Sequence, residues 1–139
     1  MTKRISIVVI TVLGVLQAGM LTATASELPY NQAIGKIRLT VPDDPKIREY
    51  LGLKARTGQF GIDQIRPGFL IIQIFNMYCP HCQHYAPSVN ELFRLIQTDP
   101  RLKERVMFIG IAVGNSPFEV DIYRKKFSVM FPLFDDKGY

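Results

Sequence analysis

Cysteine, histidine and tryptophan are scarce in this 139-residue sequence, which has two cysteines, two histidines and no tryptophan. Two cysteines alone cannot build a disulfide framework or a four-thiolate zinc site, so they either react or bind metal with help from other residues. Basic residues outnumber acidic ones by only 17 to 12, and they are dispersed along the chain. This excess is too small to indicate nucleic-acid binding. The 47% apolar content predicts a single globular domain.

The N-terminus has the features of an export signal. Lys3 and Arg4 precede an apolar run at residues 5–16, and the segment ends with small residues at 23–25. Signal peptidases cleave after such small residues. We therefore expect residues 1–25 to be a signal peptide that is cleaved after Ala25.

Two alternatives remain for this leader. Residues 5–21 approach the length of a membrane span, so an uncleaved anchor with the domain outside is one of them. A buried cytosolic helix is the other. Whether the leader is a cleaved signal peptide or an uncleaved anchor, the domain at residues 26–139 works outside the cytoplasm. We expect it in the periplasm, where disulfides persist. No cysteine follows the leader to accept a lipid.

The first half of the domain is predicted to contain two strands, with one short helix between them along the chain. Residues 37–41 alternate weakly and predict a strand, and residues 45–53 predict a helix ended by Gly52 or Gly58. Residues 69–75 are aliphatic or aromatic except for one glutamine, and they show no alternation with polar residues. This run is typical of a central strand that is buried on both faces.

A longer helix is predicted from the apolar spacing at residues 82–96. Its apolar positions lie three and four residues apart, at Cys82, Tyr85, Val89, Leu92, Phe93 and Ile96. Pro87 lies inside this helix and should kink it, because proline removes a backbone hydrogen bond. Asp99 and the proline after it should end the helix.

The rest of the chain alternates strand and helix. Residues 106–113 predict a second buried strand, and Ser116 begins a capping box for a helix that runs to about Phe127. Residues 131–134 predict a short strand, and residues 135–138 predict a turn. This order indicates an α/β fold with a parallel portion in its sheet.

The candidate chemistry lies in the segment Cys-Pro-His-Cys. Cys79 is placed where a helix begins, and the free N–H groups and dipole of a helix N-terminus favour a thiolate there. Cys79 is therefore the predicted nucleophile, and Cys82, one turn further, is placed to resolve a mixed disulfide. Pro80 and His81 are predicted to tune the redox balance, His81 by adding a cation beside the thiolate.

Metal binding is the main alternative. Cys79, His81, Cys82 and His84 could bind copper or zinc in an exported metal-binding protein. Their geometry favours this less, because His81 is adjacent to Cys82 and its ring would diverge. Haem attachment is disfavoured because Gln83, not histidine, follows the second cysteine. A redox-inactive interaction module is the third hypothesis.

The sequence resembles the thioredoxin-like superfamily at these residues. The similarity lies in Phe-Leu-Ile-Ile-Gln-Ile-Phe-Asn-Met-Tyr-Cys-Pro-His-Cys at residues 69–82 and in the following helix with Pro87. Residues 106–113, the capped helix and residues 126–138 look most like the exported TlpA/ResA-type branch. The resemblance covers residues 37–139.

This resemblance implies a central mixed sheet flanked by helices and an exported thiol–disulfide oxidoreductase. Cys79 would attack and Cys82 would resolve. The implied partners are protein thiols and disulfides, with a membrane-bound electron donor as a candidate. Nucleic acid, a small-molecule cofactor and a metal are not implied.

Several positions depart from the superfamily pattern. Tyr78 replaces the tryptophan that usually precedes the first cysteine, and Gln73 occupies a position that often holds a buried acid. Proton transfer from the second cysteine then needs water or another group. The Pro-His dipeptide matches that of DsbA-type oxidases, which leaves the direction of electron flow open. Asn76 stands where peroxiredoxins have threonine, which argues against a peroxiredoxin.

The superfamily also has a cis-proline, an edge hairpin and a final helix after the region matched here. The sequence stops at Tyr139, so we expect the last hairpin and helix to be missing and the domain to be incomplete at its C-terminus. In the alternative, Pro132 is itself the cis-proline of a shorter fold. A missing hairpin would expose a strand edge and favour aggregation.

Overall fold

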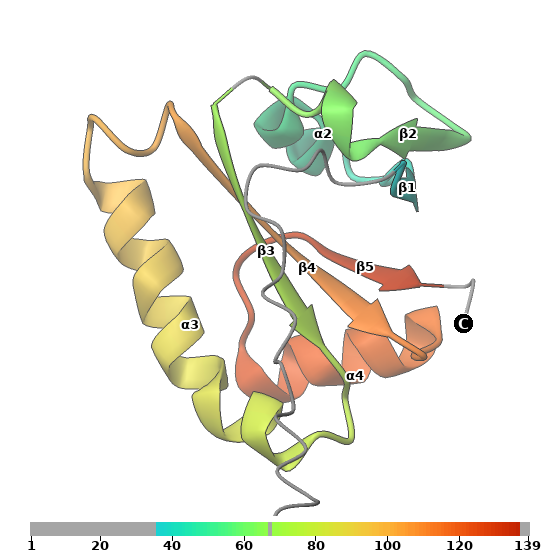
Figure 1. Ribbon diagram of the computed structural model, residues 1–139, viewed down its shortest axis with the longest axis vertical. Coiled ribbons are helices and arrows are strands. Elements are labelled where there is room, and N and C mark those ends of the chain that lie inside the picture. Colours follow the sequence, from blue (N-terminus) through green and yellow to red (C-terminus); the bar gives the residue numbers. More distant parts are fainter. Residues whose placement is uncertain (1–35, 67, 137–139) are drawn as a thin grey trace, which may run out of the picture. The chain divides into compact units, whose positions relative to one another are not determined.

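The computed structural model describes residues 36–66 and 68–136, and these contain two small β-sheets and their flanking helices (Figure 1). The predicted signal peptide, its cleavage site and the alternative membrane anchor lie outside the described residues. Within the described ranges, no helix is both long and apolar enough to cross a membrane. The elements along the chain are β1 (Arg38–Thr40), α2 (Pro45–Leu51), β2 (Gln59–Gly61), the 3-10 helix η1 (Ile62–Gln64), β3 (Phe69–Phe75), α3 (Pro80–Thr98), β4 (Val106–Val113), α4 (Pro117–Phe127) and β5 (Leu133–Asp136).

Strands β3, β4 and β5 form a parallel sheet in that order, and β1 and β2 form a separate antiparallel pair. In β4, the central strand, only Val113 is exposed. The prediction that residues 69–75 form a central strand buried on both faces is wrong. β3 lies at an edge of the described sheet, where Phe69 and Ile74 are 64% and 61% exposed. β4 instead takes the centre because strands pair with it on both sides.

The two faces of the parallel sheet have different covers. Alternate residues of β4 point to opposite faces, as the two-residue period of a strand requires. Phe108 and Ala112 belong to a core cluster with residues of α3 and α4, whereas Ile109 and Ile111 belong to a second cluster with residues of α2, β1 and β2. Helices α3 and α4 therefore cover one face, and the N-terminal elements cover the other.

The short helix α2 is fixed at both ends by local signals. The Asp44 side chain accepts a hydrogen bond from the Lys46 N–H at 2.8 Å, which satisfies one free donor of the first turn. Gly52 ends the helix with a left-handed φ of 72°, a conformation that glycine adopts without a steric penalty. Of the two candidate glycines, Gly52 is thus the one that caps this helix.

Helix α3 packs on the sheet with a face that shares most, but not all, of its residues with the predicted apolar face. The residues buried or partly buried against the core are Cys82, Ala86, Val89, Phe93 and Ile96. Tyr85 and Leu92 belong to the predicted apolar face, but they are 59% and 45% exposed and Ala86 is buried instead. The three-and-four spacing fits both sets, and the position of the sheet decides between them. Pro87 lies inside the helix, as predicted.

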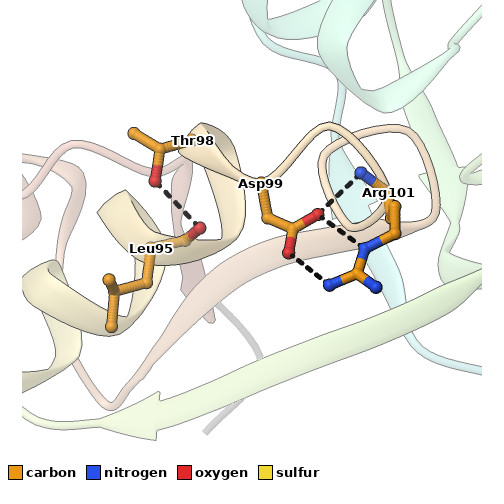
Figure 2. A network of polar contacts seen from close by, with 4 residues as sticks. All are labelled: Leu95, Thr98, Asp99 and Arg101. Atoms are coloured by element: carbon orange, nitrogen blue, oxygen red, sulfur yellow. Dashed lines mark hydrogen bonds and ion pairs between the residues drawn. The ribbon is translucent and has the colours of Figure 1, made fainter.

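Helix α3 ends at a compact polar turn (Figure 2). The Leu95 carbonyl accepts from the Asp99 N–H at 3.2 Å and also from the Thr98 hydroxyl at 3.1 Å. Asp99 accepts from the Arg101 N–H at 2.7 Å and from its guanidinium at 3.3 Å. These bonds lower the pKa of Asp99. The predicted end of the helix at Asp99 is confirmed.

Helix α4 begins with the predicted capping box. Ser116 accepts from the Glu119 N–H, and Glu119 accepts from the Ser116 N–H at 2.7 Å. The strand that follows is displaced from its predicted position, since β5 begins at Leu133 and includes Asp135 and Asp136, both predicted to lie in a turn. Pairing with β4 extends the strand to these acidic residues.

Every peptide bond between described residues is trans. Pro132 is therefore not a cis-proline in this structure, and the alternative that assigned it that role is wrong.

Candidate active site

The two cysteines lie at the N-terminus of α3, just beyond the end of β3. Cys79 is the N-cap residue, with a non-helical φ of −75° and ψ of 114°, and its sulfur accepts a hydrogen bond from the Cys82 N–H at 3.3 Å. Cys82 lies in the first turn and packs against the core cluster shared by α3 and α4. Both are free thiols and half-buried. The fold thus places Cys79 at the helix end and Cys82 on the core side.

The surroundings shift the pKa values of the two thiols in opposite directions. The pKa of Cys79 is lowered, first by a hydrogen bond from the Cys82 thiol and then by the backbone N–H groups of Cys82 and His81. The pKa of Cys82 is raised, first by burial and then by its hydrogen bond to Cys79. A thiolate therefore forms more readily on Cys79 than on Cys82.

Pro80 and His81 occupy the first two positions of α3. Proline is well tolerated at the first helical position, because the N–H it lacks has no partner within the helix. His81 is exposed and contributes its backbone N–H toward the Cys79 sulfur. The predicted effect of a protonated imidazole on the thiolate stays a prediction.

The described residues do not assemble the ligand set of the metal alternative. His84 is exposed, and its ring meets the Tyr85 ring edge to face at a centroid distance of 5.2 Å. Within residues 36–66 and 68–136, no group of three or more histidine, cysteine or acidic side chains is arranged to hold a metal ion. Cys79, Cys82 and the two histidines do not form one.

The loop between β3 and α3 is tied to the loop that follows β4. The Asn76 side chain donates to the Val113 carbonyl at 2.7 Å and accepts from the Tyr78 N–H at 2.9 Å. The Met77 N–H donates to the Asn115 side-chain oxygen at 2.7 Å. On the other side, the Gln83 side chain donates to the Met77 carbonyl at 2.7 Å. Each residue of this loop is thus hydrogen-bonded.

Two tyrosines link α4 to the site, Tyr78 from the loop before α3 and Tyr123 from α4 itself. The Tyr78 hydroxyl donates to the Glu119 carboxylate, which lowers the pKa of Glu119 and raises that of Tyr78. The buried Tyr123 hydroxyl donates to the Cys82 carbonyl at 2.9 Å. Its pKa is raised to about 12, first by burial and then by the charges of Cys82 and Cys79.

Sequence reasoning singled out the cysteines and missed these supporting residues. Asn115 is the only buried polar residue in the described part of the chain, at 3% exposure. The sequence did hold one indication of its role. Asn76 and Asn115 each closely follow a predicted parallel strand, so they are expected at the same edge of the sheet. No acidic side chain among the described residues is buried, and Gln73, in place of the usual acid, is half-buried in β3.

Comparison with solved structures identifies the fold. The chain matches a candidate protein disulfide isomerase from Bacteroides thetaiotaomicron with a TM-score of 0.58 and 18% identity, over 81% of this chain and 60% of that one. It also matches a secreted Mycobacterium tuberculosis disulfide oxidoreductase homologous to E. coli DsbE, with a TM-score of 0.50 and 17% identity, over 73% of this chain and 60% of that one. No family model and no curated protein matches the sequence.

The chain has a thioredoxin-like fold, as the sequence predicted. It spans 60% of the length of each of these two structures.

Proposed function

We propose that this chain is an exported thiol–disulfide oxidoreductase of the TlpA/ResA type, which exchanges disulfides with protein thiols through Cys79 and Cys82. The observation that carries the proposal is the opposite perturbation of two adjacent thiols at one helix N-terminus. A reactive thiolate beside a protonated second thiol is what a two-step exchange requires. The two solved structures described as a disulfide oxidoreductase and a candidate disulfide isomerase support it.

The exchange proceeds in two balanced steps. The Cys79 thiolate attacks one sulfur of a substrate disulfide, a mixed disulfide forms, and the other substrate sulfur leaves as a thiolate that takes up a proton. Cys82 then loses its proton and attacks the Cys79 sulfur. A Cys79–Cys82 disulfide forms and the second substrate thiol is released. The substrate gains the two electrons that the cysteine pair loses, and the reverse sequence oxidises a substrate dithiol.

The roles of the two cysteines give different expectations for their serine variants. Cys79→Ser should abolish insulin-disulfide reduction, because no thiolate remains to attack. Cys82→Ser should retain the attack and accumulate the mixed disulfide, which mass spectrometry detects. Unchanged turnover in Cys79→Ser would exclude the proposal.

A pH series of alkylation tests the electrostatic basis. The rate at Cys79 should rise with pH and reach half of its maximum at a lower pH than the rate of an ordinary free thiol does, because the pKa of Cys79 is lowered. An iodoacetamide series on the Cys82→Ser variant reads this thiol alone. Because that variant lacks the Cys82 thiol hydrogen bond, the wild-type chain is measured beside it.

His84→Ala is a matched control for the metal alternative. His84 is exposed and contacts no cysteine in the structure, so its loss should leave thiol exchange unchanged. Tight, stoichiometric copper or zinc uptake that falls in His84→Ala, without thiol turnover in the wild type, would favour the metal-binding function instead.

A further inference from the structure

The backbone of Met77 is held from two opposite sides. Its N–H donates to the Asn115 side chain on the β4–α4 loop, and its carbonyl accepts from the Gln83 side chain in the first turn of α3, both at 2.7 Å. These bonds link the loop to the helix that follows it and to the β4–α4 loop, which is distant in sequence. Met77 lies two residues before Cys79, in the loop that enters the helix.

We infer that Asn115 and Gln83 are positioning residues that hold the Met77 backbone between them and thereby fix Cys79 against the N-terminus of α3. This inference rests on the proposed function. Neither side chain is assigned contact with a substrate, and both act through the backbone of the loop.

The position of Cys79 depends on the loop that carries it. The Cys79 N–H donates to the Asn76 carbonyl at 3.1 Å, and the Cys79 carbonyl accepts from the Gln83 N–H at 3.1 Å. The sulfur is stabilised by donors from the first turn of α3. Hydrogen bonds weaken steeply with distance and misalignment, so a loop free to shift would lose part of this stabilisation.

Burial makes Asn115 hard to replace. Its side chain is 3% exposed, so water cannot easily take over the bond to the Met77 N–H when the side chain is removed. The loop must then shift to find another partner or leave a donor unpaired. The parallel tie from Asn76 to Val113 anchors only the start of the loop.

Asn90 offers a matched control elsewhere in the fold. Its side chain donates to the Phe127 carbonyl at 2.8 Å and so ties α3 to the end of α4, as Asn115 ties two loops. It contacts neither cysteine nor Met77. A merely structural asparagine should affect stability alone.

The experiment compares Asn115→Ala, Gln83→Ala and Asn90→Ala by iodoacetamide alkylation of Cys79 across pH and by urea unfolding. At a pH well below the pKa of Cys79, a rise of half a unit in that pKa lowers the thiolate fraction about threefold. We expect a loss of at least this size in the alkylation rate for Asn115→Ala and Gln83→Ala. Asn90→Ala should lower the urea midpoint and leave the alkylation rate unchanged.

An alkylation profile of Asn115→Ala and Gln83→Ala equal to that of the wild type would overturn the inference and leave the proposed function standing. An ordinary thiol pKa in the wild type would instead contradict the proposed function. If Asn115→Ala fails to fold, Gln83→Ala decides the result, because its side chain is only half-buried. The Met77 amide hydrogen should exchange with solvent faster in Asn115→Ala than in the wild type, because its bond to Asn115 is lost. Asn115→Asp keeps an accepting oxygen, so exchange of this amide should be slow again.

Discussion

Tyr123 connects α4 to the second cysteine, and its removal in two steps separates the contribution of its hydroxyl from that of its ring. The ring is 1% exposed and lies between Phe75 and Phe127, at centroid distances of 4.5 and 4.7 Å. Its hydroxyl donates to the Cys82 carbonyl at 2.9 Å. The same side chain thus fills the core and anchors the first turn of α3.

The two substitutions should differ several-fold in cost. Tyr123→Phe removes one hydrogen bond and keeps the ring, so we expect the free energy of unfolding to fall by about 0.5–1.5 kcal/mol. Tyr123→Ala also removes a large buried ring and leaves a cavity, and such changes cost about 3–5 kcal/mol. Urea unfolding of the reduced protein, followed by circular dichroism, measures both values.

Alkaline pH provides an independent check on the same hydroxyl. Its pKa is raised to about 12, above the value of about 10 for an unfolded tyrosine. The resulting stabilisation is fully present below pH 10 and is lost as pH rises toward 12, because ionisation is easier in the unfolded chain. Tyr123→Phe should lack this alkaline loss. Equal unfolding free energies for Tyr123→Phe and Tyr123→Ala, or an unchanged alkaline profile, would refute the reasoning.

Three further changes test local features of the fold. Gly68 has a φ of 151°, and an added Cβ would lie 2.3 Å from the Arg105 carbonyl oxygen. Gly68→Ala should therefore lower the urea midpoint by at least the equivalent of about 1 kcal/mol. A midpoint equal to that of the wild type would contradict the geometry. Ser116→Ala should cost about 1 kcal/mol through loss of the helix cap, whereas Ser116→Asp, which can still cap, should cost less in the same assay. Ile74 is exposed on β3, at an edge of the described sheet, where a strand can pair with another chain. Ile74→Lys should reduce self-association in sedimentation experiments without changing thiol alkylation. Unchanged sedimentation would argue against self-association through this edge.

The sequence predicted best where the signal was local. The helix that follows Ser116 carries its own cap, so its start was predictable from a few adjacent residues, and Gly52 was one of the two glycines predicted to end the shorter helix. The placement of Cys79 at a helix N-terminus followed in the same way from a strand, a turn and an apolar helix pattern. Such signals depend on backbone chemistry within one or two turns.

The sequence predicted less well where burial depends on neighbours. Residues 69–75 and 106–113 are similar uncharged runs, yet only the second is covered on both sides by other strands. Tyr85 and Leu92 share the helical spacing of the core residues, and the orientation of α3 on the sheet leaves them exposed. Composition and period do not specify which neighbour lies beside a strand or which face of a helix meets the sheet.

The polar support of the site depends on one further quantity, the register between β3 and β4. In the parallel pair, Phe75 lies opposite Ala112, so the loops after these strands meet at one edge of the sheet. The bonds from Asn76 to Val113 and from Met77 to Asn115 join residues 37 and 38 positions apart, close to the offset of the strands themselves. The register therefore places Asn115 beside the loop that leads to Cys79. The chemistry of the cysteine pair can be read from adjacent residues, whereas the geometry that holds it requires this long-range alignment. A shift of one residue in register would move Asn115 away from Met77 while leaving the Cys-Pro-His-Cys segment intact.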